Sequence, residues 1–136
     1  MARQYWLVKQ EPTKYPFARL LTEKRTTWDG VRNYQARNNL QAMKQGDRVL
    51  YYHSNVGLEV VGICEVAREA YPDPTTDDPR WFAVDLAAVK ALAKPVGLDR
   101  MKADPALRDV GLLKQSRLSV MPLAKAEYDR ILKLGA

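Results

Sequence analysis

Cysteine and histidine are nearly missing from this chain, which has one of each among 136 residues. The single cysteine, Cys64, excludes an internal disulfide bond. Because Cys64 lies in the strand-like run 60–66, we expect a small buried side chain and not a reactive thiol. The single histidine, His53, excludes histidine-rich metal sites, and we expect neither a metal ion nor a cofactor.

Long apolar runs are also missing. No window of about 18 apolar residues is present, as a membrane-spanning helix would need, and no apolar segment follows a basic one at the start of the chain. We therefore expect a cytoplasmic protein with no membrane partner, and we expect a monomer. The sequence has no glycine-rich phosphate loop and no Ser-His-Asp or Cys-His arrangement, which favours binding over catalysis.

What the chain does have is a positive charge balance. Its formal net charge is +6 and its pI is near 9.5, which favours an anionic partner. The basic residues are scattered among acidic ones, so an ordinary solvated surface explains the surplus at least as well until motifs are considered. With 46% hydrophobic residues, the chain fits one domain, residues 1–136, that folds without a disulfide or metal.

Segments typical of β-strands alternate with short helical segments. The expected strands are residues 5–9, 48–53, 59–69, 81–89 and 117–122. The expected helices are residues 17–23, the segment from Asn33 to Gly46, two turns at 98–103 and 105–109, and residues 126–134. Three prolines predict an irregular surface loop at 71–79, and Gly62 predicts a bulge or close packing. Together these elements predict a single α+β domain with a barrel-like sheet.

The most informative segment, residues 27–40, contains a Trp, a Gly, two Arg and three Asn. Residues 28–33 are predicted to form the loop that leads into a helix. The Trp28 indole has a flat face for stacking, and Gly30 lets the backbone approach a ligand closely. Arg32 and Asn33 supply planar groups of the type that recognise base edges or phosphates. A core position is the alternative for Trp28, whereas its polar Thr-Trp-Asp-Gly setting favours a ligand-facing one.

Five motifs occur in a recognisable order and spacing over essentially the whole chain. They are Tyr5-Trp6-Leu7-Val8-Lys9-Gln10-Glu11-Pro12, Trp28-Asp29-Gly30-Val31-Arg32-Asn33, Tyr52-His53-Ser54, Tyr71-Pro72-Asp73-Pro74 and Arg117-Leu118-Ser119-Val120. In this arrangement the sequence resembles the EVE domain family, which belongs to the PUA-like barrels with the YTH and ASCH domains. The resemblance implies a PUA-like, mostly antiparallel β-barrel flanked by short helices, with a pocket for a modified base flipped out of nucleic acid.

The partner implied by this resemblance is nucleic acid carrying a modified base, and a modified cytosine in DNA is the expected target. Trp28 is expected to stack on the base. Hydrogen bonds to the edge of the base are expected from Gln10, Asn33, Ser54 and the backbone around Gly30 and Val31. Phosphate contacts are expected from Lys9, Arg32, Arg37 and Arg117. The other candidate site residues are His53, Tyr71, Pro72, Asp73 and Ser119, and Trp81 is left open as a second wall of the pocket.

One position departs from the family pattern, which usually has Ser after the lysine of the first motif. This chain has Gln10 there, and an amide that touches the ligand would change which edge of the base is recognised. Several candidates also have a structural alternative. These are a hydrogen-bonded strand histidine for His53, an edge-strand charge for Lys9, and barrel-stabilising backbone contacts for Arg117 and Ser119.

A second function is left open by the resemblance. ASCH relatives include amidohydrolases that use a Lys with a nearby acid, so a small hydrolase acting on modified nucleosides is the alternative. Lys9, as base or nucleophile, and Glu11 would carry that reaction. A third possibility is a structural or RNA-associated adaptor whose pocket is vestigial.

Overall fold

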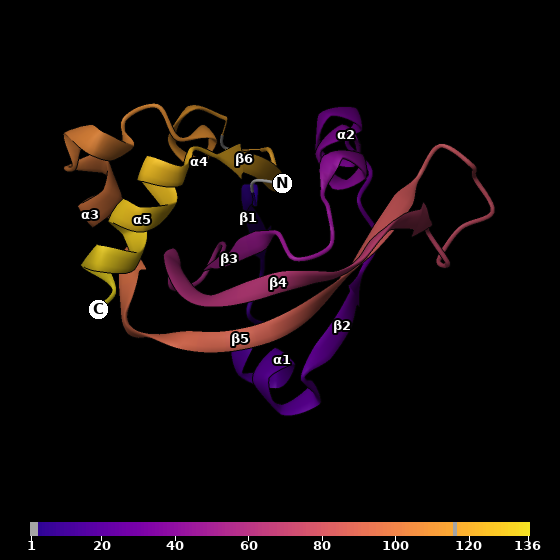
Figure 1. The fold of residues 1–136 in the computed structure, drawn as a ribbon, viewed down its shortest axis with the longest axis horizontal. Helices are drawn as coiled ribbons and strands as arrows, with labels where there is room; N and C mark the ends of the chain where they lie inside the picture. Colours follow the sequence, from indigo (N-terminus) through magenta and orange to yellow (C-terminus); the bar gives the residue numbers. More distant parts are fainter. Residues whose placement is uncertain (1–2, 116) are drawn as a thin grey trace.

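A six-stranded sheet organises the part of the chain that the computed structural model describes, residues 3–115 and 117–136 (Figure 1). The strands follow the spatial order β2-β5-β4-β3-β1-β6. They are β1 (Tyr5–Gln10), β2 (Arg25–Trp28), β3 (Arg48–His53), β4 (Glu59–Pro72), β5 (Phe82–Gly97) and β6 (Val120–Leu123). β1 and β3 are parallel, and the other neighbouring pairs are antiparallel. The expected mostly antiparallel sheet is therefore confirmed.

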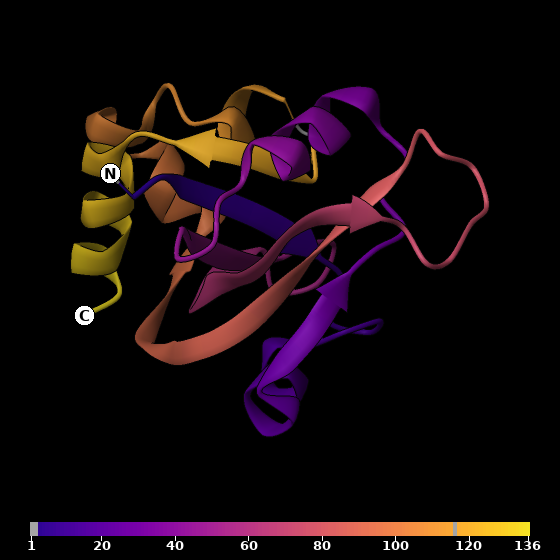
Figure 2. The same ribbon diagram turned by 45° about the vertical axis from the view of Figure 1, so that its right-hand side comes forward.

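Short helices flank this sheet. They are α1 (Phe17–Glu23), α2 (Tyr34–Ala42), α3 (Leu98–Lys102), α4 (Gly111–Lys114) and α5 (Lys125–Leu134), with a 3-10 turn at Pro105–Leu107. In Figures 1 and 2, α1 and α2 lie on opposite sides of the ribbon formed by β4 and β5, whereas α3 and α5 lie together at one end of the sheet. The expected α+β class is confirmed by this arrangement.

The sheet curls so that β2, at one edge of the spatial order, approaches β1 near the other edge. Gln10, which ends β1, lines a cavity together with Thr26 and Trp28 of β2. In the sheet itself, β5, β4 and β3 separate these two strands. The curl therefore makes the sheet barrel-like, with an opening between β2 and the end of β1.

The hydrophobic core covers both faces of this curled sheet, since Tyr51 and Leu7 are fully buried and their register places them on opposite faces. Phe17 of α1 closes the core, because a Cβ atom on Gly62 would lie only 2.1 Å from its ring. The close packing expected at Gly62 is thus confirmed. Cys64 is also fully buried, as expected, and this burial raises the pKa of its thiol.

The hairpin of β4 and β5 is longer than the sequence indicates. Tyr71 and Pro72 belong to β4 and pair with Ala83 and Phe82 of β5. The prediction of an irregular loop at 71–79 is therefore wrong for its first two residues, because the loop begins at Asp73. A proline that ends a strand removes only its own N–H from the ladder, so pairing with the long β5 prevails over the local proline signal.

The strand β2 is missing from the elements predicted by sequence. It is only four residues long, and its first three side chains are exposed or half-buried, so it has no apolar signature. It forms because it pairs with β5, with Trp28 opposite Val84. Trp28 therefore ends a strand, and the predicted loop 28–33 begins one residue later. The last strand likewise begins at Val120, three residues after its predicted start.

Candidate functional site

The opening between β2 and the end of β1 contains a cavity of about 240 Å³, which we call the Trp28 cavity. Its lining residues are Gln10, Tyr15, Thr26, Thr27, Trp28 and Asp29. Two of the predicted site residues, Gln10 and Trp28, are brought together here. Sequence motifs alone miss Tyr15 and both threonines, whereas Asp29 lies inside a recognised motif and could have been found there.

Trp28 belongs to the core as well as to the cavity wall. It is 6% exposed, and its ring meets the Tyr51 ring edge to face, with centroids 5.6 Å apart. Its indole N–H makes no hydrogen bond with the residues that the structure describes. Every fully buried side-chain nitrogen or oxygen among those residues has a partner, so this N–H is not fully buried. Trp28 thus occupies the core position given as its alternative and also lines the cavity.

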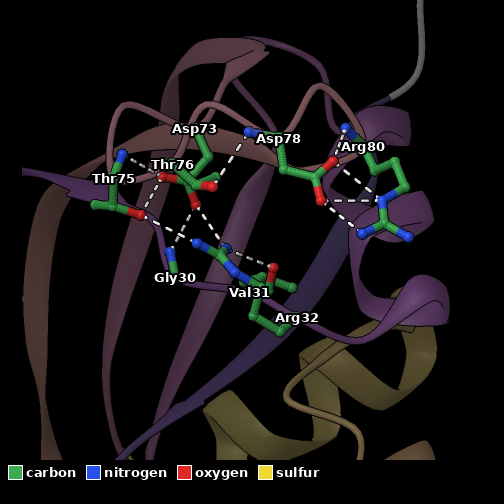
Figure 3. A network of polar contacts seen from close by, with 8 residues as sticks. All are labelled: Gly30, Val31, Arg32, Asp73, Thr75, Thr76, Asp78 and Arg80. Carbon is green, nitrogen blue, oxygen red and sulfur yellow. Dashed lines mark hydrogen bonds and ion pairs between the residues drawn. The ribbon is translucent and has the colours of Figure 1, made fainter.

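The loop 29–33 beside the Trp28 cavity is fixed by Asp73, the residue that follows β4 (Figure 3). One oxygen of the Asp73 carboxylate accepts hydrogen bonds from the Gly30 N–H at 2.8 Å and the Arg32 guanidinium at 3.0 Å. The other oxygen accepts from the N–H and the hydroxyl of Thr75, at 2.7 and 2.5 Å. Gly30 has a φ of 75°, a left-handed conformation that favours glycine. Asp73 therefore shapes the cavity through the backbone of this loop.

The Asp73 carboxylate keeps its charge although its side chain has no exposed surface. Burial by itself would raise the pKa of Asp73, but the hydrogen bonds from Thr75, Gly30 and Arg32 outweigh it and lower the pKa to about 2. Burial, and then the negative charge of Asp73, raise the pKa of the Asp29 carboxyl in the cavity. Two carboxylates thus lie close to the cavity loop, one saturated with hydrogen bonds and one not.

A second cavity, of about 310 Å³, lies beside the start of α2 and is called the Arg117 cavity here. Its lining residues are Asn33, Gln35, Lys114, Gln115, Arg117 and Leu118. Asn33 caps α2, since its Oδ1 accepts the N–H of Ala36 at 2.9 Å. The predicted base-edge residue Asn33 and the predicted phosphate contact Arg117 are thus brought together, but in a different cavity from Trp28.

The end of β1 connects the two cavities. The Lys9 N–H donates to the Ser119 carbonyl at 2.9 Å, next to Leu118 of the Arg117 cavity. Gln10 of the Trp28 cavity follows Lys9, and its carbonyl accepts the N–H of Ser54 at 3.0 Å. Four predicted site residues therefore meet through backbone contacts. Burial lowers the pKa of the Lys9 ammonium at this junction.

His53, Tyr71 and Pro72 have contacts that serve the fold. The His53 Nε2 accepts the N–H of Phe17 at the start of α1, at 3.1 Å, and burial lowers the pKa of this imidazole. The hydroxyl of Tyr71 donates to the Asp85 carboxylate. Pro72 is an exposed strand end. The contact of His53 is that of a hydrogen-bonded strand histidine, the structural alternative given for this residue.

Arg32 and Arg37 lie against a pair of aromatic rings. The Arg32 guanidinium lies 5.5 Å from the centroid of Trp81, and that of Arg37 lies 5.0 Å from the centroid of Tyr34. The two rings stack with centroids 5.2 Å apart. Trp81, the open candidate for a second wall, belongs to this stack and not to the lining of the Trp28 cavity.

A third cavity, of about 620 Å³, lies at the start of β1 and is called the Trp6 cavity. Its lining residues are Arg3, Gln4, Trp6, Ala42, Lys44, Gln45, Gly46 and Asp47. The buried Asp47 carboxylate accepts the N–H groups of Gln4 and Lys44 and the indole N–H of Trp6, at 2.9–3.0 Å. The buried carboxylate of the Trp6 cavity thus has its hydrogen-bond partners within the protein.

The acid of the hydrolase alternative has other partners. The Glu11 carboxylate pairs with Lys14 at 2.9 Å and accepts a hydrogen bond from Asn55, and these two contacts lower its pKa. Among residues 3–115 and 117–136, no three His, Cys, Asp or Glu side chains are grouped as a metal ion would require. In the same described ranges, no helix has the length and apolar character needed to cross a membrane.

Comparison with known proteins agrees with these features. The mouse (Mus musculus) thymocyte nuclear protein 1 is 36% identical, over 96% of this chain and 73% of that protein. Protein Atu2648 from Agrobacterium tumefaciens has a TM-score of 0.95 and 45% identity, covering 98% of this chain and 93% of its own. The human THYN1 protein, solved in complex with 5-methylcytosine containing DNA, has a TM-score of 0.90 and 32% identity, covering 97% of both chains.

The EVE domain, as a family, matches residues 4–134, which is nearly the whole chain. The resemblance carried by the five motifs is confirmed by this match and by the structural neighbours. The chain therefore belongs to the EVE domain family.

Proposed function

We propose that this chain binds nucleic acid carrying a modified base, most favourably a modified cytosine in DNA, and accommodates that base in the Trp28 cavity. The observation that carries the proposal is the cavity itself, which combines an indole wall with polar side chains that have unused hydrogen-bonding groups. The solved complex of human THYN1 with 5-methylcytosine containing DNA supports the same class of partner.

The size of the cavity fits one base better than a larger ligand. Pockets for drug-sized molecules usually have volumes of about 300–1,000 Å³, whereas the Trp28 cavity has about 240 Å³. Turning a base out of a duplex costs a few kcal/mol. Stacking on one aromatic ring returns roughly 1–3 kcal/mol, so Trp28 and a few hydrogen bonds suffice to offset the cost.

The Arg117 cavity supplies a site for the phosphates that flank the inserted base. Lys114 and Arg117 line it together with amide side chains, which are suitable donors to phosphate oxygens. The end of β1 links this cavity to the Trp28 cavity through the contact between Lys9 and Ser119. Phosphate contacts in the Arg117 cavity position the nucleic acid, while the base is recognised in the adjoining Trp28 cavity.

A pair of blocking variants tests the proposal. Thr26→Tyr places a ring in the Trp28 cavity, because Thr26 lines the cavity from the same face of the edge strand β2 as Trp28, and tyrosine is favoured in strands. Gln45→Tyr places the same ring in the Trp6 cavity and is the matched control. Binding is measured by fluorescence anisotropy with duplexes that contain one 5-methylcytosine or one cytosine, and with RNA of the same sequence.

We expect the unaltered protein to prefer the methylated duplex, and Thr26→Tyr to lose about tenfold or more of that affinity, which corresponds to about 1.4 kcal/mol. Gln45→Tyr should stay within about twofold of the unaltered protein. Equal binding of all probes, with a steep dependence on salt, would mean that phosphate charge alone drives association. The proposal would then be wrong.

The hydrolase alternative is supported by one observation, the burial that lowers the pKa of Lys9. Incubation of the protein with modified nucleosides, followed by chromatography, distinguishes the two functions. Product that disappears in Lys9→Ala would establish turnover. We further propose that the chain binds its partner as a monomer in the cytoplasm.

A further inference from the structure

Two polar side chains in the Trp28 cavity have hydrogen-bonding groups that the protein leaves unused. The Gln10 Oε1 accepts the N–H of Glu11 at 3.0 Å, which fixes the orientation of the amide. Its NH₂ group donates to none of the residues that the structure describes. Within the same ranges, the Asp29 carboxylate accepts no hydrogen bond from another residue and forms no ion pair. The cavity therefore contains one donor and one acceptor that are ready for a ligand.

The situation of Asp29 is unusual among the aspartates near the sheet. The Asp73 carboxylate accepts four hydrogen bonds, that of Asp47 accepts three, and that of Asp85 accepts from Arg25 and Tyr71. These three carboxylates have structural partners that account for their presence. The exposed Asp29 carboxylate bonds only its own backbone among the described residues, so it is accessible to a ligand at the cavity wall.

A cytosine base has the complementary groups on its pairing edge. Its exocyclic amine is a donor, and carboxylates are suitable acceptors for this amine. The ring nitrogen and the carbonyl beside it are acceptors, which match the NH₂ group of Gln10. Thymine has a carbonyl in place of the amine and an N–H in place of the ring acceptor, so the contact with Asp29 becomes unfavourable, whereas its second carbonyl can still accept from Gln10. 5-Methylcytosine and thymine share the same methyl group and differ only along this edge.

We infer that Asp29 and Gln10 determine specificity by accepting from the exocyclic amine and donating to the adjacent acceptors, so that the cavity takes 5-methylcytosine and rejects thymine. This inference rests on the proposed function, because it concerns the base that enters the same cavity. The environment of Asp29 agrees with it. Burial and the charge of Asp73 raise the pKa of Asp29, and a hydrogen bond from an amine would relieve this unfavourable setting.

The test compares 5-methylcytosine with thymine in duplexes of one sequence, each with the target base opposite an abasic site so that no base pair must be broken. The unaltered protein should bind the 5-methylcytosine duplex about tenfold more tightly, since one matched contact pair discriminates at this level. Asp29→Asn should bring the two affinities within about twofold, because its amide can donate to the thymine carbonyl. Gln10→Met, which removes the only one of the two groups that donates, should weaken binding of 5-methylcytosine about fivefold.

Asp99→Asn is the matched control, because Asp99 is an exposed aspartate at the start of α3 and its loss changes the net charge equally. It should retain the full preference. A preference that survives in Asp29→Asn, or equal affinities in the unaltered protein, would overturn the inference. If Thr26→Tyr still abolished binding in either case, the proposed function would stand, whereas unchanged binding in Thr26→Tyr would remove both.

Discussion

The Trp28 cavity and the Trp6 cavity lie at opposite ends of β1 and are built from the same kinds of residue. Each has a nearly buried indole, and both Trp28 and Trp6 are 6% exposed. Each also has an aspartate next to the indole and a glycine with positive φ close by. They differ in how the polar groups are used. In the Trp6 cavity the indole N–H and two backbone N–H groups all donate to Asp47.

In the Trp28 cavity the indole N–H, the Gln10 amide and the Asp29 carboxylate have no such mutual contacts among the described residues. The Trp6 cavity is also the larger of the two, at about 620 against 240 Å³. Volume is therefore a poor guide to function in this molecule. Buried polar groups are normally satisfied within a protein, so accessible groups gathered on one wall without partners are the better sign of a binding site.

The largest expected effect comes from exchanging the two aspartates for alanine. Asp47→Ala would leave the buried Trp6 indole N–H and two part-buried backbone N–H groups without an acceptor, and should lower the free energy of unfolding by roughly 3 kcal/mol or more. Asp29→Ala should change it by less than about 0.5 kcal/mol, since it removes an exposed side chain without a partner. Urea unfolding measures both values. A similar loss in the two variants would show that Asp29 also serves the fold.

This comparison explains which parts of the fold could be predicted from sequence. The strands β1 and β3 and the helix α1 carry strong local patterns, so their predicted ranges agree closely with the structure. β2 has no such pattern, because its polar residues become a strand only through pairing with β5. Tertiary pairing likewise extends β4 through Pro72. Elements that depend on a distant partner are those that the sequence does not reveal.

The same reasoning applies to the candidate site. Gln10 and Trp28 could be predicted as neighbours from the family motifs, and they share a cavity. Asn33 could not be placed, because its position as helix cap directs it to the Arg117 cavity. Asp73 was expected beside the pocket, whereas its role depends on contacts across more than forty residues of chain with Gly30 and Arg32. Such contacts leave no periodic signal in the sequence.

A smaller effect is expected from Asp73→Asn, which removes the charge beneath the loop of the Trp28 cavity. The folded pKa of about 2, against an ordinary value of 3.8, corresponds to roughly 2 kcal/mol of stability at neutral pH. Because the folded pKa is the lower one, this contribution is complete above about pH 4 and is lost as the pH falls toward 2. Unfolding measured from pH 2 to 6 should show this decline in the unaltered protein and a flatter curve in the variant. Asp99→Asn should leave the decline unchanged, and an equally steep decline in Asp73→Asn would contradict the assignment.

The smallest effect, and the most direct match between the two cavities, concerns Gly30 and Gly46, with φ values of 75° and 92°. A Cβ atom would meet nothing within 4 Å at Gly30 and only the Glu65 Oε1 at 3.9 Å at Gly46, so alanine at either position introduces backbone strain without a clash. Each variant should therefore lose roughly 1 kcal/mol of stability in urea unfolding, whereas Gly97→Ala, at a φ of −71° in open space, should lose none.

Binding of DNA distinguishes the Gly30 variant from the Gly46 variant. Relief of the backbone strain in Gly30→Ala shifts the N–H that donates to Asp73, and this shift also moves the cavity wall at Asp29. Only Gly30→Ala should weaken binding of the 5-methylcytosine duplex. An equal loss in Gly46→Ala would mean that both ends of β1 contact the nucleic acid.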